Sequence, residues 1–284
     1  MSAQRIDGKA TAAAVRAAVR EEALAFAAQH GRAPRLEVVL VGDDAASEVY
    51  VRNKERAAAK AGIAGQVRRL PASSSQPEVA ALLGQLSADQ AVDGILLQLP
   101  VPAHLDPDAL ILAIDPSKDV DGLHPVNAGR LLSGRPGLRP CTPLGCLHLL
   151  TELPLALSGQ RALVVGRSIL VGKPIALLLL EAHCTVTIAH SRTEDLAARV
   201  AEADILIAAA GRAGLIQGAW IREGATVIDV GIHRRADGSL TGDVDFAGAQ
   251  ARAAHITPVP GGVGPMTIAM LLRNTVQAAR ALRG

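Results

Sequence analysis

The sequence predicts an α/β protein of two α/β domains, the second with a doubly wound parallel sheet. Three observations support this. Apolar, strand-like runs alternate with helical patterns in both halves of the 284 residues. A long segment rich in proline and glycine, residues 115–143, separates the halves and is typical of a domain junction. The second half then restarts the alternation with a glycine-containing turn directly after its first strand.

In the first half, helical spacing of Ala, Val and Leu predicts helices, and continuous apolar runs predict buried strands. The expected order is helix 9–30, strand 35–42, helix 44–61, strand 66–70, helix 76–90 and strand 92–99. Strands joined in this way are parallel, and their carboxyl ends meet at a common crevice where ligands bind. Gln98 and the loop after it lie at such an end, and Leu99-Pro100 is a candidate cis peptide.

The second half repeats the alternation from residue 161. Strand 161–166 is followed by a helix to residue 182, strand 184–189, helix 194–202, strands 204–209 and 225–230, and a final helix over 266–282. This order is typical of a Rossmann-type dinucleotide-binding domain. We therefore expect domains at 1–122 and 123–265, with the terminal helix within 266–284 packing back on the first domain.

Composition excludes several classes of protein. The 29 basic and 27 acidic side chains are spread along the chain and aromatic residues are few, which argues against nucleic-acid binding. No apolar run approaches the ~20 residues that span a bilayer, and the first residues do not resemble a secretory leader, so we expect a cytoplasmic protein without membrane contact. Cys141, Cys146 and Cys184 form no C-x-x-C pair and are expected to be buried free thiols, with no metal implied.

The turn after the strand ending at Gly166 reads G-R-S-I-L-V-G-K-P, residues 166–174. A glycine turn that opens a helix directs free backbone N–H groups and the positive end of the helix dipole at a pyrophosphate. Its spacing does not fit a nucleoside-triphosphate loop, and Ser168 stands where the usual dinucleotide signature has its second glycine. The strand before it and the helix after it still favour a dinucleotide site.

The next strand ends near residue 190, about where a dinucleotide-binding domain reads the ribose. The sequence there is His190, Ser191 and Arg192. A hydroxyl and a guanidinium suit a 2′-phosphate, whereas an acidic side chain would prefer a bare 2′-hydroxyl, so NADP is favoured over NAD. The alternative is that Arg192 is a surface residue flanking the following helix.

Lysine is rare in this chain, with five residues against 24 arginines. Lys54 shares one helical face with Ser47 and Tyr50, because the three are spaced by three and four residues. A lysine inside a pocket can lose its proton, which a guanidinium practically cannot. The alternative on spacing alone is a half-buried Tyr50 beside a Lys54 that reaches solvent. Lys9 and Lys60 are expected to be solvated.

Five segments, in order and spacing, resemble the methylenetetrahydrofolate dehydrogenase/cyclohydrolase family. They are Y-V-R-N-K (50–54), D-G-I-L-L-Q-L-P-V-P (93–102), K-D-V-D-G (118–122), the glycine turn (166–174) and T-P-V-P-G-G-V-G-P-M-T (257–267). The resemblance runs from about Ile6 to the C-terminus. Arg56 departs from the many members that carry a second lysine there.

The resemblance implies a homodimeric folate enzyme of one-carbon metabolism and purine biosynthesis, with both of its reactions in one cleft between the domains. The first oxidises 5,10-methylenetetrahydrofolate to the methenyl cation with NADP+, and the second adds water and opens the ring to 10-formyltetrahydrofolate. It implies that Lys54 is the catalytic lysine, Tyr50 flanks the folate, Gln98 contacts Lys54 and Asp121 anchors the pterin. Asp119 is a rival carboxylate that the residues alone do not exclude.

The resemblance also implies where the cofactor and the far side of the substrate bind. The implied contacts are Gly166, Arg167 and Ser168 at the phosphates, Ser191 and Arg192 at the 2′-phosphate, and Ile232 at the nicotinamide. Residues 258–265 are expected to close the cleft, with Pro260 and Gly262 at the substrate and Val259-Pro260 as a second candidate cis peptide. The alternative for this loop is a rigid turn without a ligand.

Two other functions stay open at this point. One is a dehydrogenase of the same family that uses NAD or lacks efficient ring opening. The other is a sensor that binds folate and dinucleotide without catalysis and keeps the catalytic residues by inheritance.

Overall fold

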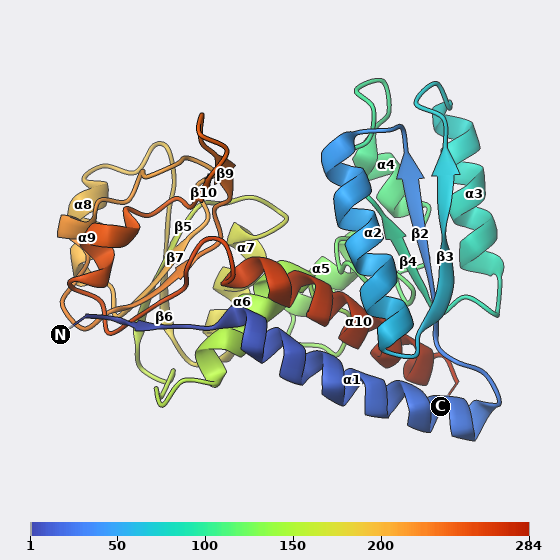
Figure 1. The fold of residues 1–284 in the computed structure, drawn as a ribbon, viewed down its shortest axis with the longest axis horizontal. Coiled ribbons are helices and arrows are strands. Elements are labelled where there is room, and N and C mark those ends of the chain that lie inside the picture. The colour runs from blue at the N-terminus through green and yellow to red at the C-terminus, as the bar shows by residue number, and fades with distance from the viewer. Residues whose placement is uncertain (1, 284) are drawn as a thin grey trace. The chain divides into compact units, whose positions relative to one another are not determined.

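The computed structural model describes residues 2–283, and the side chains of all of them except residues 45 and 46. The chain forms two compact units (Figure 1). The six-stranded unit comprises the residues up to Ala12 and Thr142–Thr267, and the three-stranded unit comprises Ala13–Cys141 and the residues from Ile268 on. This division differs from the expected boundary at 122/123, because residues 123–141 stay with the first half and the residues up to Ala12 join the second.

The three-stranded unit contains a parallel sheet in the order β3-β2-β4. Its strands are β2 (Arg35–Val41), β3 (Ala64–Leu70) and β4 (Gly94–Leu97). Its helices are α2 (Ala45–Lys60), α3 (Gln76–Ala88), α4 (Pro107–Leu112) and α5 (Pro125–Leu132), with most of α1 (Gly8–His30) and α10 (Val263–Ala281). The helices and strands expected here are confirmed to within a few residues at their ends. Helices α4 and α5 were missed, and α5 lies inside the expected irregular junction.

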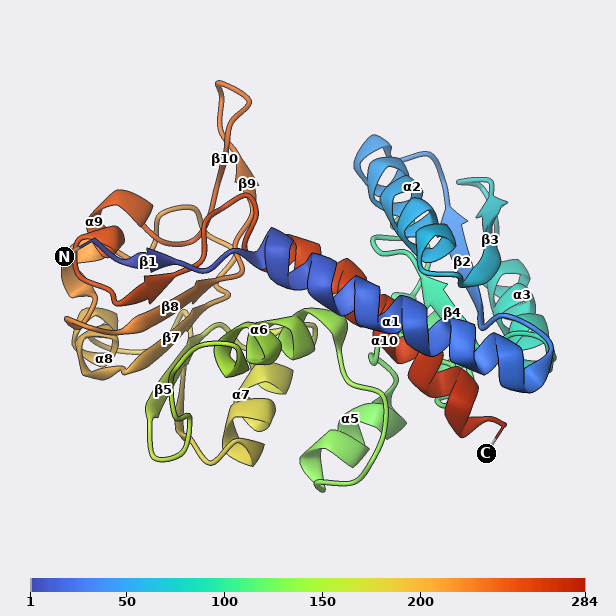
Figure 2. The same ribbon diagram turned by 60° about the horizontal axis from the view of Figure 1, so that its bottom comes forward.

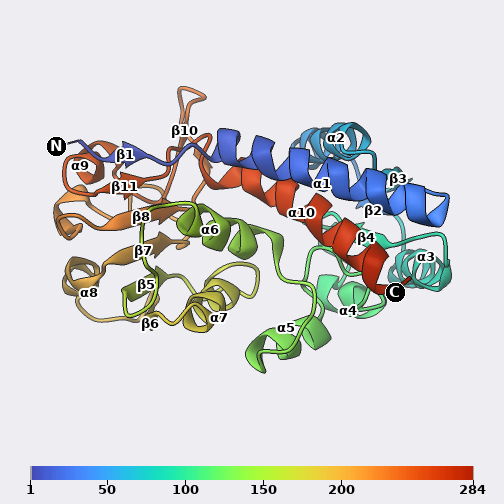
Figure 3. The same ribbon diagram turned by 90° about the horizontal axis from the view of Figure 1, so that it is seen from below.

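Helices cover the sheet of this unit because alternate residues of each strand face opposite sides. Val39 and Val41 of β2 pack with Val79 and Leu83 of α3 in one buried cluster. Helix α2 contacts β2 and β3. Within this unit, α1 and α10 run side by side (Figures 2 and 3), where Arg280 donates a 2.9 Å hydrogen bond to Glu22.

The six-stranded unit has parallel strands in the order β1-β11-β8-β7-β5-β6. They are β1 (Gln4–Arg5), β5 (Arg161–Val165), β6 (Thr185–Ala189), β7 (Ile205–Ala208), β8 (Thr226–Asp229) and β11 (His255–Ile256). Without β1, the order counted along this unit is 2-1-3-4-5, one of the two common doubly wound orders, which turns around between β5 and β7. The doubly wound prediction is confirmed.

Helices and a hairpin complete the six-stranded unit. They are α6 (Cys141–Thr151, beginning in the other unit), α7 (Gly172–Glu181), α8 (Leu196–Glu202), α9 (Phe246–Gln250), the 3₁₀ turn Gly218–Trp220 and the antiparallel pair β9 (His233–Arg234) and β10 (Leu240–Thr241). The two-residue strands were missed, because a periodicity of two has no room to show in so short a segment.

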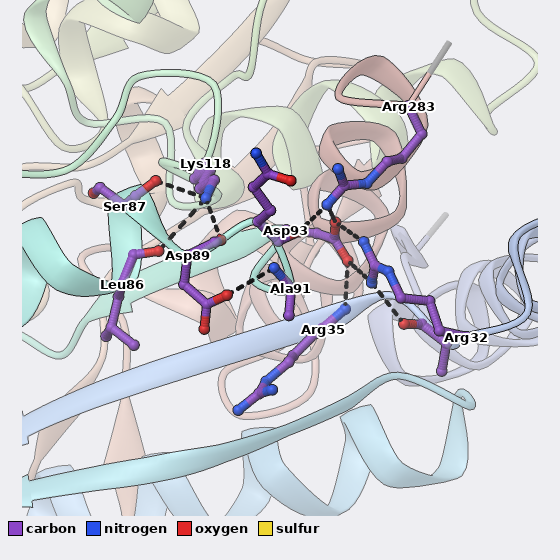
Figure 4. A network of polar contacts seen from close by, with 11 residues as sticks. Arg32, Arg35, Leu86, Ser87, Asp89, Ala91, Asp93, Lys118 and Arg283 are labelled. Carbon is purple, nitrogen blue, oxygen red and sulfur yellow. Dashed lines mark hydrogen bonds and ion pairs between the residues drawn. The ribbon is translucent and has the colours of Figure 1, made fainter.

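A buried carboxylate fixes the start of β4 (Figure 4). Asp93 is fully buried and accepts two 2.7 Å hydrogen bonds from the Arg32 guanidinium and one of 2.9 Å from the backbone N–H of Arg35. The Arg283 guanidinium lies 3.7 Å from the same carboxylate. Paired and hydrogen-bonded in this way, the buried charge is tolerated and holds β4 to β2.

Candidate active site

The site begins with a direct contact between a lysine and an amide in the three-stranded unit. The Nζ of Lys54 donates a 2.9 Å hydrogen bond to Oε1 of Gln98, whose own amide donates to the Leu99 carbonyl at 2.6 Å. Gln98 follows β4, its backbone N–H bonds to Val39, and its side chain is buried. The Leu99-Pro100 peptide is cis, as expected.

Helix α2 presents Lys54 to this contact because of its spacing. Asp44 caps the helix by accepting a hydrogen bond from the Ser47 N–H at 2.8 Å. Ser47 is buried, whereas Tyr50, which lies between Ser47 and Lys54 on the same face of α2, is 47 % exposed. The shared face predicted for these residues is confirmed, with Tyr50 half open to solvent.

The surroundings of Lys54 favour its neutral form. Burial lowers the pKa of Lys54 from the ordinary 10.5, and attraction to Asp121 only partly opposes this. The pKa of Asp121 is raised above its ordinary 3.8, again by burial, with Lys54 pulling it back. Burial disfavours both charges, so a larger fraction of Lys54 is present as the neutral amine than in water at the same pH.

The structure distinguishes the roles of the two rival carboxylates, Asp119 and Asp121. Asp119 is buried and accepts hydrogen bonds from the His124 N–H at 2.8 Å and the Asn127 side-chain amide at 3.0 Å. It therefore holds its own loop. Asp121, two residues on, interacts with Lys54 and is only partly buried, so Asp121 is the carboxylate that belongs to the lysine site.

Two further residues, Cys141 and Asn274, contact the loop that carries Asp121. The Cys141 thiol donates to the Val120 carbonyl at 3.2 Å, and burial together with the Asp121 carboxylate raises its pKa well above the ordinary value. The Asn274 amide of α10 donates to the Val120 and Arg139 carbonyls, both at 2.8 Å. Asn274 thus ties the loop carrying Asp121 to the segment that leads into Cys141.

Gly122 allows the loop that carries Asp121 to lie close to the backbone of Arg139. Gly122 has φ +72°, and a Cβ there would lie 2.3 Å from the Arg139 carbonyl carbon. The Lys118 ammonium, at the start of the same loop, donates to the carbonyls of Ser87 and Asp89 at 2.7 Å each (Figure 4). Lys118 therefore satisfies the C-terminal carbonyls of α3.

The glycine turn lies at the switch point of the six-stranded sheet. Gly166 follows β5 with φ +132°, and a Cβ there would lie 2.1 Å from the Ala209 carbonyl oxygen beyond β7. Ser168 Oγ accepts hydrogen bonds from the N–H groups of Val171 and Gly172, at 3.1 and 3.3 Å, and so begins α7. Arg167 and Ser168 are exposed.

A tight turn follows β6. The His190 N–H donates to Thr193 Oγ1 at 2.8 Å and the Arg192 N–H donates to His190 Nδ1 at 3.2 Å. The Ser191 and Arg192 side chains are exposed beyond that edge of the sheet. These residues fit a dinucleotide: backbone approaches closely at Gly166, and a hydroxyl and a free guanidinium stand beyond the neighbouring strand.

A pair of buried aspartates, which the sequence did not reveal, orders the loops after β7 and β8. Asp229 accepts hydrogen bonds at 2.9–3.0 Å from the N–H groups of Gly231, Asp243 and Val244. Asp243 accepts from the N–H groups of residues 210–212 and from His233 Nε2 at 2.7 Å. Burial raises the pKa of Asp229 to about 6. Ile232, beside these groups, is 52 % exposed.

Pro260 and Gly262 lie in the six-stranded unit, in the loop between β11 and α10. Pro260 is exposed and its peptide with Val259 is cis, as expected. Gly262 is buried, and a Cβ there would lie 2.6 Å from that of Thr257. Its smallness serves the packing of the loop.

The structure thus brings Lys54, Gln98 and Asp121 together in one unit. In the other unit, the turn of Gly166, Arg167 and Ser168 lies at the switch point, Ser191 and Arg192 follow the neighbouring strand β6, and Ile232 follows β8. Cys141, expected as an inert buried thiol, is free and buried but also lies against Asp121. Asn274 was missed. A buried Asn inside the apolar helix pattern A-M-L-L-R-N-T-V was the available signal.

Neither a metal site nor a membrane span is found in the part of the chain that is described. Within residues 2–283, no three His, Cys, Asp or Glu side chains gather in a way that would hold a metal ion. None of the helices there combines the length and apolar character needed to cross a bilayer.

The fold and the amine site define a class, an enzyme with a dinucleotide-binding domain. The catalytic-domain model of the tetrahydrofolate dehydrogenase/cyclohydrolase family matches residues 6–121, and its NAD(P)-binding-domain model matches residues 140–283. The chain belongs to this family.

Individual relatives and solved structures support the same family assignment. The chain is 61 % identical over 283 residues to bifunctional protein FolD of Acidiphilium cryptum, covering all of both chains. The FolD structure from Campylobacter jejuni matches with a TM-score of 0.96 at 43 % identity over 99 % of each chain. The Trypanosoma brucei enzyme, complexed with NADP and an inhibitor, matches with a TM-score of 0.94 at 40 % identity over all of both chains.

Proposed function

We infer that this chain is a bifunctional folate enzyme. It oxidises 5,10-methylenetetrahydrofolate to 5,10-methenyltetrahydrofolate with NADP+ and hydrolyses the product to 10-formyltetrahydrofolate. The observation that carries this conclusion is the partly buried amine of Lys54, which is held by Gln98 and interacts with Asp121, in a chain whose two halves match the two domains of the family. We assign the folate to the three-stranded unit and the dinucleotide to the six-stranded unit.

Lys54 is proposed as the base of the hydrolytic step. Water adds to the cationic methenyl carbon and loses a proton, which the neutral amine accepts. The bond to one ring nitrogen then breaks, that nitrogen takes up a proton, and the carbon stays as the formyl group while one proton is released overall. Gln98 supports this role because its acceptor oxygen fixes Nζ without adding a negative charge that would keep the ammonium protonated.

Asp121 and Tyr50 are proposed to orient the folate. A carboxylate offers two acceptor oxygens to the donor edge of a pterin. The half-exposed Tyr50 ring lies on the Lys54 stripe and flanks the substrate. Such fixed placement contributes several kcal/mol to a reaction, about 7–11 in the best cases. Pro260 and Gly262 are proposed to contact the substrate from their loop.

NADP+ supplies the hydride acceptor when bound. We propose that Gly166, Arg167 and Ser168 hold its phosphates, since the turn brings backbone close to the switch point and exposes both side chains. Ser191 and Arg192 are proposed to bind the 2′-phosphate, and Ile232 to contact the nicotinamide.

We also propose a cytoplasmic homodimer. The outer edge of β3 is unpaired among the described strands and offers backbone groups to a second copy.

The experiment supplies purified protein with methylenetetrahydrofolate and either NADP+ or NAD+, and follows absorbance of reduced nucleotide and methenyl product. We expect NADPH to form and the methenyl product to be consumed. Comparable turnover with NAD+, or methenyl that accumulates, would indicate the dehydrogenase alternative. Binding of both ligands without NADPH would indicate a sensor.

A further inference from the structure

A basic pocket lies between α1 and α2, away from the lysine site. Its cavity of ≈ 430 Å³ is lined by Arg16 and Arg20 of α1 and by Asn53, Arg56 and Lys60 of α2. All five belong to the three-stranded unit. Four cations and an amide thus face one open space, in a chain whose formal net charge is only +2.

No acidic partner neutralises these cations. Of the ion pairs formed within residues 2–283, none involves any of the four, and the pocket lining contains no Asp or Glu. Of the acids on the same helices, Glu22 pairs with Arg280 and Glu48 pairs with Arg69. Glu21 and Glu55 are exposed and do not line the pocket. Clustered like charges without a counter-charge repel one another and attract an anion.

The spacing of the four cations indicates the shape of the anion that the pocket can bind. On each helix the two cations are four residues apart, about 6 Å along the axis. The four cations are therefore spread along the two helices and do not surround a single point. A compact anion would contact only some of them, whereas a chain that carries one carboxylate per unit can contact them all. Arg20, Arg56 and Lys60 are exposed and Arg16 is partly buried, so most of these cations are accessible to a flexible chain.

Helix α2 connects this pocket to the proposed folate site. Tyr50 and Asn53 are three residues apart, so the ring on the Lys54 stripe neighbours the amide at the pocket. Tyr50 is half exposed. The glutamate of a folate lies at the end of the molecule opposite the pterin, and γ-linked extension adds one carboxylate per residue.

We propose that this pocket, formed by Arg16, Arg20, Asn53, Arg56 and Lys60, binds the γ-linked oligoglutamyl tail of the folate substrate. The proposal rests on the proposed function, since it takes folate to be the substrate. It assigns the pocket to substrate affinity, so tail length acts on KM and leaves kcat unaltered.

The test compares kcat/KM for NADP-dependent oxidation of monoglutamyl and tetraglutamyl methylenetetrahydrofolate. Each screened charge pair changes affinity by a factor of about two to five, so the unaltered enzyme should prefer the longer tail by about tenfold or more. The preference should shrink as ionic strength rises. The double variant R20E/K60E, at two exposed positions, should bring the ratio close to one, whereas R52E, an exposed position on α2 outside the pocket, should keep it.

Three outcomes overturn the proposal. The unaltered enzyme oxidises the monoglutamyl substrate without preferring the longer tail, R20E/K60E keeps the preference, or tripolyphosphate binds the pocket while tail length has no effect, which makes it a general anion site. Calorimetric binding of the two folates needs no turnover. It decides the pocket proposal even if neither substrate is oxidised, a result that would reject the proposed function.

Discussion

Lys54 and Gln98 are joined by a 2.9 Å hydrogen bond in which the lysine is the donor and a neutral amide is the acceptor. An amide oxygen positions the nitrogen without adding a second carboxylate beside it, so burial lowers the pKa of Lys54 more than the attraction of Asp121 raises it. The chemistry proposed for the site depends on this balance.

Replacing Gln98 by Glu should reverse that balance. A carboxylate in contact with Nζ raises the pKa of Lys54 and keeps it protonated. Because general-base catalysis contributes about 10²–10⁴-fold, we expect hydrolysis of the methenyl product to fall by about that much at neutral pH and to recover as pH rises. Q85E, an exposed position on α3, is the control. Stopped-flow decay of methenyl absorbance measures the effect, and an unchanged profile would speak against the base role.

Asp121 and Asp119 should respond differently to the same change. Asp121→Asn removes charge facing the folate, so we expect KM for the folate to rise about 10- to 100-fold, as for the loss of a charged hydrogen bond. Asp119→Asn should instead destabilise the protein by about 1–3 kcal/mol through its bonds to His124 and Asn127.

Steady-state kinetics and urea unfolding of both variants measure this pair of effects. The opposite assignment, with Asp119 setting KM and Asp121 setting stability, would exclude the pterin role of Asp121.

Arg192→Ala should change nucleotide preference. Loss of a charge-assisted contact to the 2′-phosphate costs about 1.5–3 kcal/mol, so kcat/KM for NADP+ should fall about 10- to 100-fold while that for NAD+ stays unchanged. R199A, on the following helix α8, serves as the matched control. Equal losses with both nucleotides would show that Arg192 acts on the fold, and no loss would show that it is a surface residue.

Asp229 should leave a signature in the pH dependence of stability. Its pKa is raised from 3.8 to about 6 in the folded protein, so between these values the folded state holds a proton that the unfolded chain has lost. Its contribution is therefore largest at low pH and decreases as pH rises through about 6, by about 3 kcal/mol in total.

Asp229→Asn does not titrate at this position. The stability of the unaltered protein relative to this variant, measured by urea unfolding from pH 4 to 7.5, should decline across that range. A difference that is flat or grows with pH would contradict the raised pKa.

The sequence predicted the parts of the site that lie within one element or follow one strand. Tyr50 and Lys54 share a helical face by spacing, and Gln98 follows a strand end, so local pattern and sheet geometry suffice. The choice between Asp119 and Asp121 needed the structure, because hydrogen bonds to residues further along the chain engage one and leave the other.

Cys141 and Asn274 were not assigned to the site because nothing local relates them to Asp121. Cys141, at the start of α6, lies against Asp121, and Asn274 of α10 donates to the neighbouring Val120 carbonyl. No periodicity encodes either of these tertiary contacts. Helix α5 was missed for a different reason: it lies in a Pro- and Gly-rich segment. Pro125 at its first turn and the His124 side chain, which accepts a hydrogen bond from the Val126 N–H, are nevertheless ordinary start signals.

The most direct test of the account is the pKa of the Lys54 amine in the folded protein. With five lysines in the chain, a pH titration of ¹⁵Nζ-labelled side chains by NMR resolves each of them, and the signal absent from the Lys54→Met variant identifies Lys54. The account predicts that this signal titrates below the ordinary 10.5, and a midpoint at or above that value would contradict it.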